Sequence, residues 1–378
     1  MAEVRLRGMT WDHARGFDPM VATSVAYAAR YPGVTISWEK RSLQAFADRP
    51  IGEMAQGYDL MVIDHPHVGE VARAGHLVDF NTVGRNAEVA AIAAGTVGAS
   101  HPSYAFDGGQ WGLAIDAATP VACYRPDLLD AAPARWDQVL ELARAGRVGF
   151  ALIPINALMT FFGMARNRGY AIAEDPERLI AQEEGAETLE ILCEIVSLID
   201  PRCLTLDPIG IYEWMGRSVE APAYSPFGYG YTNYSRDGYC RFPLVFANAP
   251  GVGGNGPRGT VLGGTGIAIS AACAAPEVAV DYALWIAGAD CQKGLYFESG
   301  GQPGHAAAWE DEACNAACRD FMKNTRVTLE TAWVRPRYDG YMAFQDRGGD
   351  IVHACLRGDV GVRETLDRLD AAYRESRG

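Results

Sequence analysis

The first eighty residues alternate between strand-like and helix-like patterns, and this alternation limits the possible folds more than any other feature of the chain. Apolar and polar residues alternate over residues 4–7 and 34–38, and residues 60–63 form a continuous apolar run. Between the first two segments, apolar positions recur at helical spacing as far as Pro32: Met20, Val21, Ser24, Val25 and Ala28. Strands separated by helices predict a parallel sheet with right-handed crossovers.

A second α/β region is predicted to begin before the first is complete. With 378 residues, the chain is longer than one hydrophobic core usually sustains, so we expect two domains. Extended segments are predicted at residues 111–115, 119–124, 148–152 and 261–270. Helices are predicted at residues 136–145, 155–166, 176–198, 276–287 and 360–373, with a tyrosine-rich loop at 224–239.

Charge and composition exclude several classes of protein. The chain has 47 acidic and 33 basic side chains, a net charge of -14, so a phosphate backbone would be repelled and no nucleic-acid partner is expected. No stretch reaches the roughly 18 apolar residues of a membrane span, and no apolar leader follows the first eight residues. The nine cysteines are odd in number and dispersed, which favours a reducing, cytoplasmic compartment.

Polar residues follow two of the predicted parallel strands. Trp11, Asp12 and His13 come directly after the first strand. Asp64 and His65 come directly after the third strand. Because carboxyl ends of parallel strands meet at one sheet edge, we expect both loops to open on a cleft for a polar ligand. The alternative is that Trp11 packs against the following helix and that Asp12 or Asp64 caps it.

Other candidate ligand contacts lie further along the chain. Gly264 and Thr265 precede a strand, where small residues allow backbone amides to approach a ligand, or simply form a tight turn. Tyr224 and Tyr229 could stack on a sugar ring or belong to the core. Arg335, in an extended segment with Trp333 and Arg337, could fork onto a carboxylate or form surface ion pairs.

A metal site is the other chemistry that the histidines could support. Asp64, His65 and His67 with His13 offer nitrogen and oxygen ligands, but no spaced partner pair completes a site. No G-x-S-x-G nucleophile motif occurs either. We therefore predict no metal and no cofactor.

Several segments carry a family resemblance through their order and spacing. They are residues 58–64 with 71–79, 111–116, 122–129, 136–140, 263–270, 276–279 and 292–303, the last ending in Gly-Gly-Gln-Pro. In this order they resemble the family 1 extracellular solute-binding proteins of ABC transporters, across almost the whole chain.

The resemblance implies an α/β fold of the type II periplasmic-binding-protein kind, a two-lobed clamshell with a discontinuous hinge. Lobe 1 would comprise residues 1–115 and 261–322, and lobe 2 residues 116–260 and 323–378. The implied function is reversible binding of a small polar solute, a sugar derivative or an organic acid, between the lobes for ABC-type import. A periplasmic monomer with ABC permease subunits as partners is also implied.

The resemblance also implies which residues face the ligand. They are Trp11, Asp12, His13, Asp64, His65, Thr119, Asn156, Tyr224, Tyr229, Gly264, Thr265, Trp333 and Arg335. Two alternatives stay open at this point. One is a cytoplasmic enzyme or sensor on the same fold, with His13, His65, Asp12 and Asp64 as acid and base. The other is an iron-binding family member with tyrosine and histidine ligands.

Overall fold

The chain divides into two compact units, each built from two separate segments. The computed structural model describes residues 3–41, 51–253 and 256–378. Unit 1 comprises Met1–Ala118 and Gly263–Cys314, and unit 2 comprises Thr119–Leu262 and Asn315–Gly378. The α/β fold class built from discontinuous segments is thereby confirmed.

The last boundary between the units falls after Cys314, whereas the sequence predicted it at residue 322. Of the three boundaries, this one differs most from the prediction. Helix α14 (Phe321–Glu330) lies in unit 2, because it packs against β9 (Val245–Ala247) of that unit. The rings of Phe321 and Phe246 have centroids 4.9 Å apart. The first two boundaries lie within three residues of the expected positions 115 and 260.

Unit 1 is a five-stranded sheet with helices packed on it and one short hairpin. Its strands are β1 (Val4–Trp11), β2 (Val34–Arg41), β3 (Leu60–Asp64), β4 (Ala105–Phe106), β5 (Gly109–Gln110), β6 (Leu113–Ala114) and β10 (Thr265–Ile269). Its helices are α1 (Ala14–Arg30), α3 (Ile51–Gly57), η1 (His65–His67), α4 (Val68–Ala74), η2 (Phe80–Thr82), α5 (Asn86–Ala94), η3 (Pro102–Tyr104), α10 (Pro276–Ala287), α11 (Ala289–Cys291), η6 (Gln292–Tyr296) and α12 (Ala306–Glu310); α13 (Glu312–Ala317) spans the last boundary.

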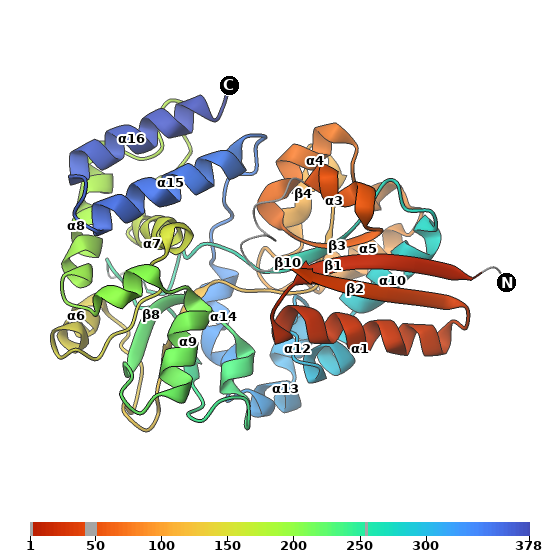
Figure 1. Cartoon of the computed structure of the whole chain (residues 1–378), viewed down its shortest axis with the longest axis horizontal. Helices are drawn as coiled ribbons and strands as arrows, with labels where there is room; N and C mark the ends of the chain where they lie inside the picture. The colour runs from red at the N-terminus through yellow and green to blue at the C-terminus, as the bar shows by residue number, and fades with distance from the viewer. Residues whose placement is uncertain (1–2, 42–50, 254–255) are drawn as a thin grey trace. The chain divides into compact units, whose positions relative to one another are not determined.

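The strands of this sheet follow the order β2-β1-β3-β10-β6. β1 and β2 are parallel along their whole length, from Val4 opposite Val34 to Trp11 opposite Arg41, with α1 packed along them (Figure 1). β3 is parallel to β1, and its four apolar residues are buried, as a strand covered on both faces requires. The predicted parallel sheet is confirmed for β1–β3, whereas β10 runs antiparallel to β3 and β6.

The face that α1 buries differs in part from the predicted one. Val21 and Val25 are 38% and 67% exposed, although both belonged to the predicted apolar stripe. Met20 and Ser24 of that stripe are buried as predicted, and Thr23 is buried in addition. The Thr23 and Ser24 hydroxyls lie 2.8 and 3.2 Å from the Tyr282 hydroxyl of α10, and these hydrogen bonds allow the two polar side chains to be buried.

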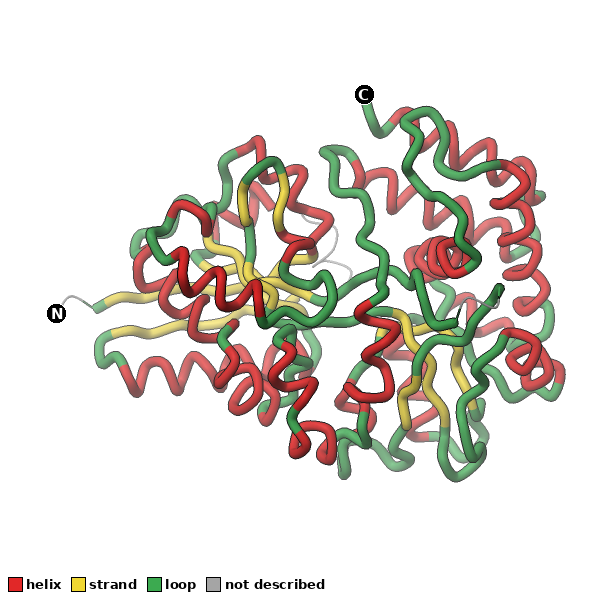
Figure 2. Tube along the Cα trace, turned by 180° about the vertical axis from the view of Figure 1, so that it is seen from behind, coloured by secondary structure: helices red, strands yellow, loops and turns green. Residues whose placement is uncertain are grey.

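Unit 2 is mainly helical around a three-stranded antiparallel sheet of order β8-β7-β9 (Figure 2). Besides β9 and α14, its elements are β7 (Pro120–Tyr124), α6 (Trp136–Arg144), α7 (Pro154–Asn167), α8 (Gln182–Val196), η4 (Pro201–Thr205), α9 (Pro208–Arg217), β8 (Tyr224–Tyr229), η5 (Thr232–Ser235), α15 (Tyr341–Leu356) and α16 (Val362–Glu375).

Three predictions for unit 2 are wrong. Residues 148–152 form no strand, only a single bridge between Val148 and Tyr224. The tyrosine-rich segment begins with β8 rather than a loop, because its backbone pairs antiparallel with β7. The helix expected from Pro176 begins only at Gln182.

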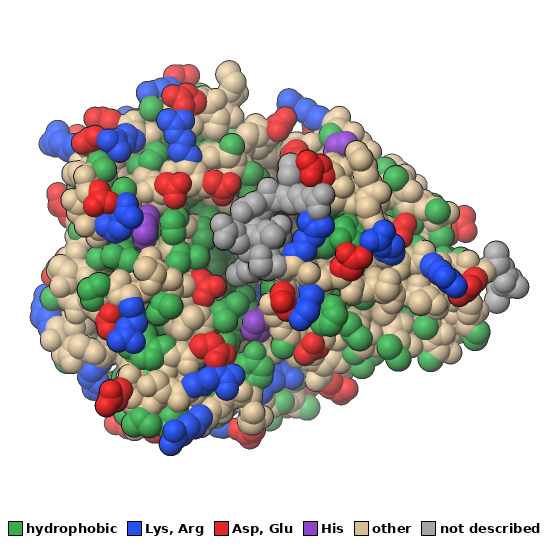
Figure 3. Space-filling view, in the orientation of Figure 1, with side chains coloured by type: hydrophobic (Ala, Val, Ile, Leu, Met, Phe, Trp, Pro, Cys, Tyr) green, Lys and Arg blue, Asp and Glu red, His purple; other side chains and the backbone are tan. Residues whose placement is uncertain are grey.

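Acidic and basic side chains are interspersed on the surface of the molecule. Figure 3 shows lysine and arginine side chains among aspartates and glutamates over the face that it presents. No helix of the described residues is long and apolar enough to cross a membrane.

The packing of α15 on α7 depends on two adjacent glycines. A Cβ at Gly349 would lie 2.9 Å from the backbone carbonyl carbon and oxygen of Pro154, the first residue of α7. A Cβ at Gly348 would lie 3.3 Å from a methyl group of Leu158, a side chain that can rotate. A side chain at position 349 would therefore require the backbone to move, whereas one at position 348 requires only a side chain to rotate.

We predict that Gly349→Ala is less stable than Gly348→Ala by about 1–3 kcal/mol, because only the first change forces two helices apart. Both changes gain the same helix propensity, which cancels in the comparison. Urea unfolding of the two variants measures the difference. Equal midpoints would mean that α15 and α7 are not in the close contact described.

Candidate ligand-binding site

The carboxyl ends of the parallel strands bring two of the predicted loops to one sheet edge. β1 ends at Trp11 and its parallel neighbour β3 ends at Asp64. β10 begins at this edge, with Thr265 directly opposite Asp64. The expectation that both loops open at the same edge is confirmed.

Trp11 and His13 take the structural roles named as the alternative. Trp11 is 4% exposed, and its ring lies so close to Gly16 in α1 that a Cβ at that glycine would overlap it. The Nδ1 atom of His13 accepts a hydrogen bond from the Arg15 backbone N–H at 3.0 Å and caps α1. The capping group is therefore His13, where Asp12 or Asp64 was expected.

The other residues of the edge differ in whether they reach the surface. The carboxylate of Asp12 is exposed and lies 2.6 Å from the Lys40 ammonium group. Asp64 is partly exposed. His65 is fully buried and packs edge-on against Tyr104, with ring centroids 6.2 Å apart. The edge therefore presents two carboxylates together with the partly exposed ring of His13, while His65 is withdrawn from it.

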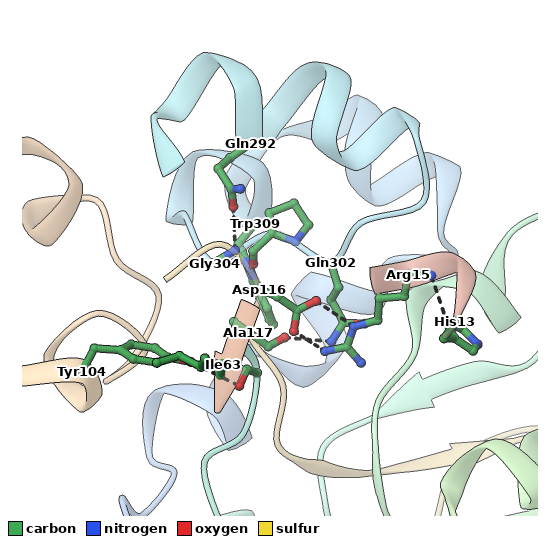
Figure 4. Close-up of polar contacts among 12 residues, drawn as sticks. His13, Arg15, Ile63, Tyr104, Asp116, Ala117, Gln292, Gln302, Gly304 and Trp309 are labelled. Atoms are coloured by element: carbon green, nitrogen blue, oxygen red, sulfur yellow. Dashed lines mark hydrogen bonds and ion pairs between the residues drawn. The ribbon is translucent and has the colours of Figure 1, made fainter. Parts of the chain in front are cut away.

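A buried ion pair that the sequence did not predict lies beneath this edge (Figure 4). The Nε atom of Arg15 donates to Oδ2 of Asp116 at 2.7 Å, and a terminal nitrogen of Arg15 pairs with Oδ1. Burial raises the pKa of Asp116, the positive charge of Arg15 opposes that rise, and the charge of Asp64 adds to it. Asp116 and Asp64 are thus in electrostatic range of each other.

Backbone hydrogen bonds hold the segment that carries Asp116. Asp116 and Thr265 exchange N–H···O bonds at 3.0 and 3.1 Å. The side-chain amide of Gln302 donates to the Ala117 carbonyl at 2.8 Å, as Figure 4 shows. Gly264 has φ +89° and lies against the Asp116 carbonyl, so a side chain there would clash and only glycine fits this position.

The hydroxyl of Thr265 is a polar group still available at this edge. Its Oγ1 atom is buried and has no hydrogen-bond partner among the described residues. A buried hydroxyl without a partner is costly unless something satisfies it. Thr265 therefore brings a buried hydroxyl that has no partner among the described residues to this edge.

A second cluster lies in unit 2 and combines aromatic rings with a buried arginine. Arg335 is 6% exposed and donates to Oε1 of Gln345, on α15, at 2.6 Å. Tyr341, the first residue of α15, is fully buried; burial raises the pKa of its phenol, and the Arg335 charge partly offsets this. Tyr229 is within electrostatic range of the same phenol. Gln345 and Tyr341 were not predicted from the sequence.

Trp333, two residues before Arg335, has a partly exposed ring that lies against α7. The ring makes an edge-to-face contact with Phe162 at 5.8 Å, and the Arg166 guanidinium lies 5.8 Å from it. Residues 333–337 form no strand; Trp333 makes a single bridge with Val261. The expectation of an extended strand at this place is wrong.

Three other predicted residues have different surroundings. The Thr119 hydroxyl lies 2.7 Å from that of Thr260 and donates to the Val261 carbonyl at 3.2 Å, so it joins two segments of unit 2. Tyr224 is fully buried in the core beside Cys123. Asn156 lies in the first turn of α7 and is 8% exposed. Within the described part of the chain, no three His, Cys, Asp or Glu residues are grouped to hold a metal ion.

The chain is similar to known proteins in part of its sequence and in its whole fold. Residues 10–163 match the family model of the bacterial extracellular solute-binding proteins. No curated protein matches the chain. The resemblance to the family 1 extracellular solute-binding proteins is confirmed.

Solved structures with the same fold cover almost the whole chain. A solute-binding protein of an ABC transporter from Thermotoga lettingae, bound with α-D-tagatose, has a TM-score of 0.83 and 16% identity, covering 99% of this chain and 100% of that one. One from Agrobacterium radiobacter, in complex with ribitol, has a TM-score of 0.82 and 20% identity, covering 99% of each. Maltose-bound MalE3 from T. maritima has a TM-score of 0.82 and 15% identity, covering 98% of this chain and 99% of that one. The fold is that of the two-lobed solute-binding proteins.

We predict that Arg15→Met lowers the free energy of unfolding by about 3–5 kcal/mol, because it leaves the Asp116 carboxylate buried without its partner. In this variant the folded-state pKa of Asp116 lies further above its unfolded value. The folded protein then binds a proton before the unfolded chain does, so the loss of stability shrinks as the pH falls from 8 to 5.

Unfolding curves at several pH values measure this effect. Arg5→Met is the matched control, because the Arg5–Glu3 pair is mostly exposed and its loss leaves stability nearly unchanged. A stability loss for Arg15→Met that is small, or that grows at low pH, would contradict the assignment of a buried ionised pair.

Proposed function

We propose that this protein reversibly binds a small neutral polyhydroxylated solute, a sugar or a polyol, for import by an ABC transporter. Each unit carries its own cluster of candidate ligand contacts: Asp12, Asp64 and Thr265 in unit 1, and Tyr229, Trp333, Arg335, Tyr341 and Gln345 in unit 2. Aromatic rings beside hydrogen-bonding groups suit a ligand with apolar faces and many hydroxyls.

The carboxylates at the sheet edge of unit 1 are the observation that carries this choice. Asp12 and Asp64 reach the surface there, and Asp116 lies beneath them with its charge paired to Arg15. Carboxylates accept hydrogen bonds from hydroxyl groups but repel another anion, so they favour a sugar over an organic acid. Ligands named for proteins of the same fold, which are tagatose, ribitol and maltose, belong to this neutral class.

A binding role, rather than catalysis, fits the histidines of the site. The proposed acid and base would be His13 and His65, but the first caps α1 and the second is fully buried against Tyr104. A group that exchanges protons with a ligand must reach it within hydrogen-bond distance. We therefore propose that the ligand is released unchanged, and that the protein acts outside the cytoplasm with permease subunits as partners.

Calorimetric titration with neutral sugars and polyols (maltose, tagatose, ribitol) and with acids (glucuronate, citrate) tests the ligand class. We predict binding in the neutral group, weakened about tenfold to a hundredfold by Asp64→Asn and by Trp333→Leu, since each change removes one hydrogen-bond acceptor or one stacking surface.

Matched controls are available in each unit. Glu277→Gln changes an exposed carboxylate of α10, and Trp214→Leu changes a partly exposed indole of α9; both should leave the affinity unchanged. Binding of the acids alone would overturn the proposed class, and loss of affinity in the controls would overturn the assignment of the residues.

A further inference from the structure

One segment of unit 1 that carries part of the family resemblance, residues 300–304, lies outside the candidate site. It begins with the Gly-Gly-Gln-Pro motif. Gly300 has φ +99°, a backbone conformation that favours glycine. A Cβ at Gly301 would lie 2.3 Å from the Tyr296 ring, so no larger residue fits there. The two glycines therefore fix the path by which the chain reaches Gln302.

The side chain of Gln302 joins this segment to the one that carries Asp116 (Figure 4). Gln302 is fully buried, and its amide nitrogen donates to the Ala117 carbonyl at 2.8 Å. The Ala117 N–H donates in turn to the Gln302 carbonyl at 3.1 Å. Asp116 forms an antiparallel bridge with Pro303. One residue therefore holds both polar backbone groups of Ala117, directly after the buried carboxylate.

The other side of residues 300–304 is anchored to the helices of unit 1. The Gly304 N–H lies 2.8 Å from Oε1 of Gln292, in η6, and 3.2 Å from the Ile115 carbonyl. The Gln292 amide nitrogen donates to a backbone carbonyl of α10 at 2.9 Å. The indole N–H of Trp309, in α12, donates to the Pro303 carbonyl at 2.8 Å. The segment is thus a fixed base from which the glutamine side chain reaches Ala117.

Residues 115–117 are bonded in turn to a candidate ligand contact of unit 1. Asp116 and Thr265 exchange backbone hydrogen bonds, and the Ile115 N–H donates to the Thr265 carbonyl at 3.1 Å. Thr265 lies directly opposite Asp64, the last residue of β3. A displacement of residues 115–117 would therefore move the Thr265 hydroxyl at the sheet edge and the carboxylate beneath it.

We propose that Gln302 is a positioning residue for ligand binding, an inference that rests on the proposed function and adds to it a residue outside the candidate site. Because its side chain is fully buried, it acts through the segment that it holds and not by touching the ligand. A site whose groups are held in place before the ligand arrives loses less entropy on binding. Removal of the Gln302 amide donor therefore weakens binding although every candidate ligand contact is still present.

Gln302→Met keeps a side chain of similar length and removes the donor to Ala117. We expect calorimetric titration with maltose, tagatose and ribitol to show about tenfold weaker binding than for the wild type. Gln110→Met is the matched control. Gln110 is also buried in unit 1 and donates to the His101 and Gly112 carbonyls at 3.1 and 2.8 Å, on the segment before β6. Its replacement should lower stability and leave the affinity unchanged.

Gln302→Glu distinguishes positioning from a general loss of stability. A protonated carboxyl group can donate to the Ala117 carbonyl as the amide does, whereas a carboxylate cannot. Burial raises the pKa of an introduced carboxyl group, so the donor is kept at low pH. We expect affinity within about threefold of the wild type at pH 5 and about tenfold weaker at pH 8. The groups that interact with Asp116, and whose own titration the wild-type profile controls for, are Arg15 of α1, Asp64 of β3 and Tyr296 of η6.

Hydrogen exchange of the ligand-free protein tests the positioning without a ligand. The amides of Ala117 and Thr265 should exchange at least about tenfold faster in Gln302→Met than in the wild type or in Gln110→Met. Unchanged exchange at both amides would overturn the proposal, and so would unchanged affinity in Gln302→Met or equal weakening of Gln302→Glu at pH 5 and pH 8. If the wild type binds none of the three solutes, the proposed function fails, and the exchange rates alone decide the role of Gln302.

Discussion

The buried ion pair between Arg15 and Asp116 is the interaction on which the geometry of unit 1 depends. Taking both charges out of water costs several kcal/mol per ion, and only a well-aligned pair with further hydrogen bonds offsets that cost. Arg15 meets this condition with two nitrogens on one carboxylate, and Asp116 exchanges backbone hydrogen bonds with Thr265. The start of α1, the first residue of β10 and the end of unit 1's first segment are therefore held together by one charged group.

The sheet edge above this pair is polar, and the loop that carries its polar groups is held firmly in place. Trp11 packs on Gly16 and His13 caps α1, so the loop between β1 and α1 has little freedom. Its exposed member, Asp12, is held as well: its backbone N–H donates to the Arg41 carbonyl at 2.6 Å, and its carboxylate lies 2.6 Å from the Lys40 ammonium group. A loop held by its neighbours on both sides can position one carboxylate without reorganising when a ligand binds, which reduces the entropic cost of binding.

Local features of the fold were predictable from the sequence, whereas the partners of buried polar groups were not. The limits of α10 and the positions of β1–β3 follow from periodicity, because each depends on residues close in sequence. Arg15 lies on the buried stripe of α1, which signals a required partner, but that partner is 101 residues away. The burial of Thr23 was missed for the same reason, since its hydrogen-bond partner, Tyr282 of α10, is distant in the sequence.

In the candidate site, too, residues placed by neighbouring strands could be predicted, whereas residues placed by contacts distant in the sequence could not. Asp12, Asp64 and Thr265 could be placed at one edge because parallel strands fix where their ends meet. Tyr341 and Gln345 gave no signal, because their role depends on Arg335 folding back onto the first turns of α15.

Helix α15 connects three separate features of unit 2 along one rigid element. Its first turns carry Tyr341 and Gln345, its middle contacts α7 through Gly349, and it also packs against α8. The glycine contact leaves no room for α15 to slide along α7 without backbone atoms colliding. A displacement at one end of α15 must therefore move the whole helix, so close packing at its centre restricts the positions of the residues that contact Arg335.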